Sequence, residues 1–250
     1  MIIKTSLDDI VSQVQALKRP GKPVAVVTDW DNTLWKGISS FQALGKYDKA
    51  NGTDYAKRGT EAAKRVLGKG GNFRSLIEAG VQATKGLSFR GYWDAYRTVF
   101  SEDKWIPETL EAIARLNPWF ILATSGSWYH GIKTAASSEL PVALKKHGFT
   151  SPQVQAFATV MEFSDVQQDG TTGNTLYVAT PYLRRQAIAA LKKGDTAALQ
   201  KRATVATRSG PFNLLDRAAD ISPKGYYVAA FGTEKDRAWL RQADAGFLIK

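Results

Sequence analysis

The segment VAVVTDWDNTLWKG, residues 24–37, places two aspartates directly after a short apolar run. Residues 23–28 are apolar enough to form a buried strand. Asp29 and Asp31 follow, and side chains in an extended chain return to the same side at every second residue. The segment therefore predicts a pair of carboxylates on one side of the chain, at the point where a buried strand ends.

The rest of the chain predicts an alternation of strands and helices around this segment. Further strands are expected at 119–123, 154–160, 226–231 and 246–249, with a hairpin turn at Asp169 and Gly170. Helices are expected at 6–17, 182–193, 196–207 and 212–219. This alternation is typical of an α/β fold, here a Rossmann-like parallel sheet flanked by helices, which binds ligands beyond the carboxyl ends of its strands.

Residues 36–117 depart from the alternation because their pattern is mostly helical, with breaks at glycines. We therefore predict two domains, a core formed by 1–35 and 118–250 and an inserted helical domain formed by 36–117. The insert is basic, since residues 46–90 hold ten Lys or Arg and four Asp or Glu. Such a run is most often a solvated helix face, and its functional interpretation is a surface that attracts anionic ligands.

The composition narrows the chemistry that a site in this chain can perform. The 250 residues include no cysteine and two histidines, which excludes disulfides, thiolate metal sites and cysteine nucleophiles. A bound metal would have to be a hard cation held by oxygen ligands, which favours magnesium over zinc. The net charge of +11 favours an anionic partner, either a polyanion or a small substrate.

The sequence also bears on where the protein is located. The first twenty residues carry charges throughout and lack the apolar run of a signal peptide, and no later segment reaches eighteen apolar residues. We therefore expect a cytoplasmic protein without a membrane span.

The two aspartates suggest acid, base and nucleophilic chemistry. One carboxylate can attack an electrophile, while the second donates a proton to the leaving group and later takes one from water. A divalent cation bridging the first carboxylate to a phosphate would offset the repulsion between the anions. The alternative interpretation is a strand that ends in a turn, where Asp and Asn are common because their side chains bond nearby backbone.

The segment VVTDWDNTLW resembles the first motif of the haloacid dehalogenase superfamily, whose phosphatases carry Asp-x-Asp-x-Thr at the end of the first strand. The resemblance implies that Asp29 becomes phosphorylated, that Asp31 is the general acid and base, and that the Asp31 carbonyl helps to bind magnesium. The segment WFILATSGS resembles the second motif of the family, a strand that ends in Ser or Thr. Ser125 fits that position best, and Thr124 is the reserve.

The third motif of the family is a lysine or arginine that precedes the penultimate strand by one helix. Arg208 has this spacing, and Lys201, Arg184 and Lys224 are the competing candidates. For each of them a solvated surface charge is the alternative.

The fourth motif of the family resembles VAAFGTEKDRAWLRQADAGFLIK, but it is altered. Thr233 stands where the family has its first aspartate, and Asp236 matches the second aspartate if one residue is deleted. The resemblance makes Asp29, Asp31, Glu234 and Asp236 the candidate metal ligands. The alternative for Glu234 and Asp236 is an ordinary helix N-terminus, where acidic residues are favourable.

The helical insert corresponds to the cap that covers the site in this family, and RVLGKGGNFRSLIEAG resembles the cap segment of phosphoserine phosphatases. Gly80 and Ile38 stand where those enzymes carry an arginine and an acidic residue, which disfavours phosphoserine as the substrate. Trp30, Trp35 and Trp128 are interpreted as core residues, with an aromatic wall for the substrate as the alternative. Candidate substrate-binding residues are Thr33, Thr124, Gly126, Arg74 and Lys201.

We therefore expect a magnesium-dependent phosphatase that acts on a small phosphorylated metabolite through an aspartyl-phosphate. Two alternatives remain: a phosphatase of nucleotides or nucleic-acid ends, and a catalytically impaired protein of the same fold whose basic surface binds nucleic acid. Nucleic acid is the less favoured partner, because a binding protein needs no general acid. Salt-sensitive oligonucleotide binding without turnover would favour the impaired protein.

Overall fold

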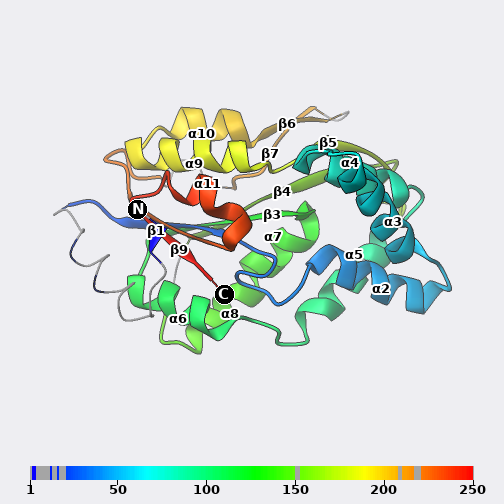
Figure 1. Cartoon of the computed structure of the whole chain (residues 1–250), viewed down its shortest axis with the longest axis horizontal. Coiled ribbons are helices and arrows are strands. Elements are labelled where there is room, and N and C mark those ends of the chain that lie inside the picture. The colour runs from blue at the N-terminus through cyan, green and yellow to red at the C-terminus, as the bar shows by residue number, and fades with distance from the viewer. Residues whose placement is uncertain are drawn as a thin grey trace.

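The computed structural model describes residues 2–3, 12, 16, 21–149, 153–207, 210–216 and 221–249 (Figure 1). Its main sheet has the strand order β1-β9-β8-β2-β3-β4-β5, in which every neighbouring pair is parallel except β4 and β5. The strands are β1 (Ile2–Ile3), β2 (Val24–Asp29), β3 (Phe120–Trp128), β4 (Gln153–Phe163), β5 (Thr172–Tyr177), β8 (Tyr227–Gly232) and β9 (Ala245–Leu248). The predicted helix at 6–17 falls on residues of which only 12 and 16 are described.

Helices cover both faces of this sheet, as the alternation of the sequence predicts. One face carries α9 (Pro181–Lys193), α10 (Thr196–Ala203) and α11 (Arg237–Leu240), and the other carries α6 (Pro107–Leu116), α7 (Tyr129–Ser137) and α8 (Glu139–Lys145) (Figure 1). The prediction of an α/β fold with a parallel sheet is confirmed. Among the described residues, no helix combines the length and the apolar character that a membrane crossing requires.

Strand β2 lies in the middle of the sheet because its side chains can be buried on both faces. Val24, Val26 and Val27 are at most 3% exposed, and the strand pairs with β3 on one side and β8 on the other. A strand buried in this way is typical of parallel sheets covered by helices. The carboxyl end of β2 is thereby held between two neighbours.

Four helices gather beyond one end of the sheet: α2 (Ser39–Asn51), α3 (Tyr55–Gly68), α4 (Phe73–Ala83) and α5 (Phe89–Phe100) (Figure 1). They are called the helical insert below. The antiparallel pair β4–β5 reaches the segment between α4 and α5, where the Thr172 amide donates to the Leu87 carbonyl at 2.9 Å and the Phe89 amide donates to the Gly170 carbonyl at 3.0 Å. The division into domains at 36 and 117 stays a prediction.

Aromatic packing joins the helical insert to the sheet. Trp30 and Trp35 contact Phe100 and Trp105 edge to face, with ring centroids 5.0 to 5.6 Å apart. Trp128 stacks on a tyrosine of α5 and is 1% exposed. Pairs of this kind contribute about 0.5–1.5 kcal/mol each beyond the burial of their area. The interpretation of the three tryptophans Trp30, Trp35 and Trp128 as core residues is confirmed.

The prediction of a helix through 207 is wrong, and so is the start of the second predicted helix at 212, whose residues 217–219 lie outside the described residues. Helix α10 ends at Ala203, and β6 (Thr204–Thr207) pairs antiparallel with β7 (Gly210–Asn213). Gly210 has φ 111°, a conformation that β-carbons disfavour, and the β-branched residues of β6 suit an extended chain. The pairing of 204–207 with 210–213 therefore prevails over the helical pattern here.

Candidate active site

Asp29 occupies the carboxyl end of the central strand. Its backbone is in register with Thr124 of β3, and the preceding residue, Thr28, is in register with Phe231 of β8. The Asp29 side chain is buried, with 2% of the residue exposed. Ligands of open α/β sheets are expected here, beyond the carboxyl ends of the strands.

Two cationic side chains flank the Asp29 carboxylate. Arg184 of α9 places Nη2 3.1 Å from Oδ1, and Lys235 places Nζ 3.7 Å from Oδ2. Burial raises the pKa of Asp29 to about 6, and the attraction of Arg184 and Lys235 opposes that rise. The carboxylate is therefore mostly ionised at neutral pH, as a nucleophile must be.

Asp31 is bound to hydroxyl groups rather than to cations. Its Oδ1 accepts from the Ser39 amide at 2.8 Å and the Ser39 hydroxyl at 2.7 Å. Its Oδ2 accepts from Ser125 Oγ at 2.9 Å and Ser127 Oγ at 2.8 Å. A hydroxyl can donate or accept, so Ser125 and Ser127 can remain bonded to this group whether or not it carries a proton.

The end of β3 supplies the hydroxyl predicted from the second motif. Ser125 bonds to Asp31, whereas the Thr124 hydroxyl donates to the Thr28 carbonyl at 2.9 Å and is thereby used within the sheet. Gly126 lies against α4, since a β-carbon there would be 2.9 Å from Phe73 Cζ. Of the two hydroxyls considered, Ser125 is the one that reaches the aspartates.

Arg184 is the basic residue that the structure brings to the site. Arg208, preferred from the sequence, lies outside the described residues, while Lys201 and Lys224 are exposed on α10 and before β8. Arg74 is exposed on α4 and pairs with Glu78. Arg184 is 3% exposed, so its charge is buried together with that of its carboxylate partners.

Asp236, predicted as a metal ligand, is already saturated by protein donors. Its Oδ1 accepts from Arg184 Nη1 at 3.3 Å and Trp239 Nε1 at 2.9 Å. Its Oδ2 accepts from the Thr233 amide at 2.9 Å and the Thr233 hydroxyl at 3.0 Å, closing a capping box at the start of a 3-10 turn, Glu234–Asp236. Asp236 therefore holds Arg184 in place and shapes the turn that follows β8.

The other candidate metal ligands do not join it in a cation site. Glu234 is bound to Arg237, and its side chain is 67% exposed. The Asp31 side chain faces serines, which leaves the predicted backbone carbonyl as its one oxygen for a cation, and Thr233 brings no charge. Within the described ranges, no group of three or more Asp, Glu or His side chains is placed to hold a metal ion. The residues present do not fit magnesium, which demands near-ideal octahedral oxygen ligation.

Three contacts at the site were not expected from the sequence. Ser127 could have been found, because it follows Ser125 by two residues on a strand and so returns to the same side. Ser39 reaches Asp31 through the start of α2, and Lys235 reaches Asp29 through the turn after β8. Both depend on the path of a loop, for which the sequence carries no periodic signal.

Arg184, which contacts Asp29, has a buried Nε without a hydrogen-bond partner among the described residues, and so have Trp30 Nε1 and Thr33 Oγ1 of the segment that carries the two aspartates. Buried polar groups are nearly always paired, with protein, water or ligand. A water molecule or a ligand is therefore expected to supply the missing partners. Thr33 was a predicted substrate-binding residue, and that role stays a prediction.

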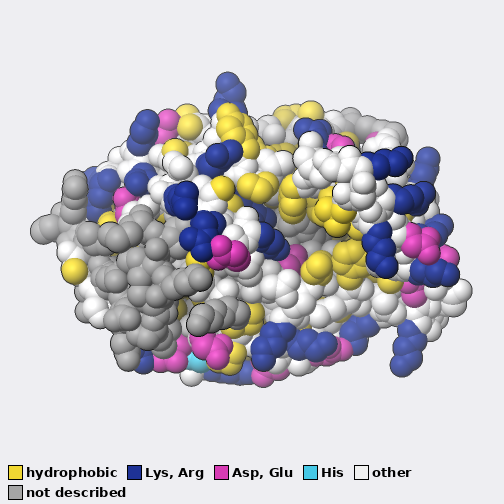
Figure 2. Space-filling view, viewed as in Figure 1, with side chains coloured by type: hydrophobic (Ala, Val, Ile, Leu, Met, Phe, Trp, Pro, Cys, Tyr) yellow, Lys and Arg dark blue, Asp and Glu magenta, His cyan; other side chains and the backbone are white. Residues whose placement is uncertain are grey.

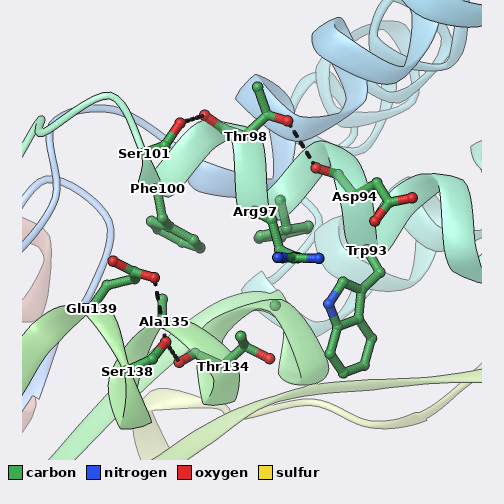
Figure 3. Close-up of a pocket in the computed structure, with 12 residues that line it drawn as sticks. Trp93, Asp94, Arg97, Thr98, Phe100, Ser101, Thr134, Ala135, Ser138 and Glu139 are labelled. Carbon is green, nitrogen blue, oxygen red and sulfur yellow. Dashed lines mark hydrogen bonds between the residues drawn. The ribbon is translucent and has the colours of Figure 1, made fainter.

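A separate cavity of about 660 Å³ lies between α5 and the α7–α8 pair. Arg97 and Trp93 of α5 face Thr134, Ser138 and Glu139 across it (Figure 3). Neither Asp29 nor Asp31 lines this cavity. It is therefore distinct from the site at the end of β2.

No family model and no curated protein matches the sequence. Solved structures do resemble the fold. A protein of unknown function from Bordetella pertussis Tohama I aligns with a TM-score of 0.51 and 11% identity over 88% of this chain and 86% of that chain. A substrate-bound phosphoserine phosphatase complex aligns with a TM-score of 0.50 and 14% identity over 90% and 84% of the two chains.

A probable phosphoserine phosphatase from Vibrio cholerae gives a TM-score of 0.48 and 15% identity over 89% of this chain and 54% of that one, so this chain spans about half its length. At these identities the comparisons establish a fold and no more. The chain has a haloacid dehalogenase-like fold of the kind found in phosphoserine phosphatases.

Proposed function

We propose that the chain hydrolyses phosphate monoesters of small molecules through an aspartyl-phosphate formed on Asp29. The observation that supports this most directly is the pairing of two buried aspartates with different environments at the end of β2. Asp29 faces cations, as a nucleophile that receives a phosphoryl group should. Asp31 faces hydroxyls that tolerate both of its protonation states, as a general acid and base requires.

The chemistry follows from these roles. An Asp29 carboxylate oxygen attacks phosphorus, the bond between phosphorus and the ester oxygen breaks, and the departing oxygen keeps the electron pair and takes the proton of Asp31. Asp31 then removes a proton from water as the water oxygen attacks the aspartyl-phosphate. Inorganic phosphate leaves and the Asp29 carboxylate is restored. Arg184 positions Asp29 throughout, because it is itself anchored by Asp236.

The site favours a small substrate. Asp29 and Asp31 are 2% and 7% exposed, so the site has to open before a substrate can reach them. Gly80 offers no charge for a substrate carboxylate and Ile38 is an exposed apolar residue, which again disfavours phosphoserine. On the face shown in Figure 2, lysine and arginine side chains are scattered among acidic ones rather than gathered in one stripe, which gives little support to a nucleic-acid surface.

The test uses p-nitrophenyl phosphate, whose leaving group needs no proton from the enzyme. Asp31→Asn should release one equivalent of nitrophenol rapidly and then stall, because the second step lacks its base. Peptide mass spectrometry should locate the phosphate on Asp29. Asp29→Asn, the matched control, should give neither the burst nor the phosphopeptide. Unchanged turnover by Asp29→Asn would refute the proposal, and salt-sensitive oligonucleotide binding without turnover would favour the nucleic-acid alternative.

A further inference from the structure

The Asp29 carboxylate has a cation on each of its two oxygens. Arg184 bonds to Oδ1 at 3.1 Å, and the Lys235 ammonium lies 3.7 Å from Oδ2. A divalent ion bound to Asp29 would have to share an oxygen with one of these positive charges. At such separations, the repulsion between two cations is worth several kcal/mol at the effective dielectric of a protein surface.

Much of the charge beside Asp29 is already paired without an ion. Asp29 and Asp236 face Arg184 and Lys235, and Asp31 is the further carboxylate whose charge acts on Asp29. In an arrangement with a metal, another carboxylate after β8 would be expected to help offset the extra charge. The sequence has Thr233 at that point, and the Thr233 hydroxyl is used to bond Asp236.

Lys235 differs from Arg184 in the way that a phosphate-binding group should. Arg184 is buried and both of its terminal nitrogens already bond carboxylates. Lys235 has a side chain that is 59% exposed, and its contact to Asp29 is long. An ammonium carries three donors on a flexible stem, and at 3.7 Å it makes no hydrogen bond to Asp29, so it can turn to a phosphoryl oxygen without breaking one.

The backbone that carries Lys235 is nevertheless fixed. The turn Glu234–Asp236 begins directly after β8 and is closed by the reciprocal bonds between Thr233 and Asp236. Asp236 is in turn tied to Arg184, which contacts Asp29. The ammonium is thus mobile at its tip and anchored at its base, beside the carboxylate that receives the phosphoryl group.

We propose that Lys235 supplies the positive charge that a divalent cation provides in phosphatases of this fold, so that the site binds phosphate and turns over without a metal. The inference rests on the proposed function. During attack by Asp29, the ammonium neutralises charge on the non-bridging oxygens of the phosphoryl group while Arg184 keeps the nucleophile oriented. No bond to nitrogen forms, and the proton and leaving group move as described above.

The experiment measures binding of inorganic phosphate by calorimetry in EDTA, with the intact chain. The native protein should bind millimolar phosphate under these conditions, and added Mg²⁺ should not tighten binding. Lys235→Met should weaken binding at least tenfold, as expected for the loss of a charge-assisted hydrogen bond, and Lys235→Arg should retain most of it. Lys224→Met is the matched control, because it removes an exposed lysine at the opposite end of β8 and should change nothing.

Phosphate binding that appears only with Mg²⁺, that is absent altogether, or that is equal in the native chain and Lys235→Met would each overturn the inference. Circular dichroism of each variant confirms folding. A turnover assay with and without EDTA separates the two proposals. Phosphate binding through Lys235 without ester hydrolysis would refute the proposed function and the metal-free turnover that rests on it, and would leave Lys235 as a phosphate-binding group. Hydrolysis that needs Mg²⁺ would refute the inference alone.

Discussion

Replacing the proposed nucleophile should make the protein more stable. Burial raises the pKa of Asp29 from 3.8 to about 6, so the folded chain holds this group in its charged form at a cost. The shift of roughly two pKa units corresponds to about 3 kcal/mol, at 1.36 kcal/mol per unit. Asp29→Asn removes the charge and keeps the shape, and we therefore expect it to raise the free energy of unfolding by up to about 3 kcal/mol at pH 8.

The pH dependence gives this prediction a definite sign. Because the folded pKa exceeds the unfolded one, the contribution of Asp29 to stability is fully present below pH 3.8 and is lost as the pH rises through about 6. The advantage of Asp29→Asn should therefore be largest at pH 8 and shrink steadily as the pH falls from about 6 toward 4. The net rise in the pKa of Asp29 already includes the attraction of Arg184, because that attraction opposes the effect of burial.

Urea unfolding followed by tryptophan fluorescence, in EDTA and at several pH values between 5 and 8, measures the difference. The slope of the free energy against urea should be the same for both proteins, which shows that the native and unfolded states remain comparable. Asp94→Asn, at an exposed carboxylate on α5, should alter stability by less than about 0.5 kcal/mol. If Asp29→Asn proves less stable than the native chain at pH 8, the attraction of the two cations outweighs burial and the reasoning fails.

Three other substitutions test the contacts around the site. Ser125→Ala removes one of the two hydroxyls on Asp31 Oδ2 and should lower kcat/KM about 100-fold in a phosphate-release assay, so full activity would exclude a role for that hydroxyl. Gly126→Ala brings a methyl within 2.9 Å of an aromatic ring of α4, and it should raise KM several-fold with little effect on kcat, an effect that steady-state kinetics would reveal or contradict. Gly131→Ala would place a β-carbon 2.4 Å from the Tyr96 ring, and thermal unfolding should show a loss of about 1–3 kcal/mol with no specific defect in phosphate binding.

The sequence specifies the centre of this fold more fully than its edges. Residues 24–29 are apolar up to an aspartate, and that pattern is sufficient to place a buried strand and an acid at its end. The helical pattern across 196–207 misleads, because 204–207 pair as a strand with 210–213. That pairing depends on contacts between residues that periodicity does not report.

The candidate site shows the same division. Asp29 is the last residue of β2, Asp31 follows it, and Ser125 lies near the end of β3, so all three could be located by counting residues. Arg184 projects from a helix that crosses the sheet, so its approach to Asp29 depends on the packing of α9 and not on its distance along the chain. Lys235 lies in the altered fourth motif, where the resemblance assigns a role to its acidic neighbours Glu234 and Asp236 and none to the lysine.

The β4–β5 strand pair has a mechanical consequence for the proposed function. It fastens the stretch between α4 and α5 through backbone hydrogen bonds at Leu87 and Phe89. At the other end of the insert, the Lys36 amide donates to the Lys104 carbonyl and the Ile106 amide donates to the Leu34 carbonyl. A body braced at two separated points cannot swing freely about one pivot. Under the proposed function, any movement of the insert away from the site must bend the strand pair along with the helices, so the stiffness of this pair should set how often the site admits a new substrate.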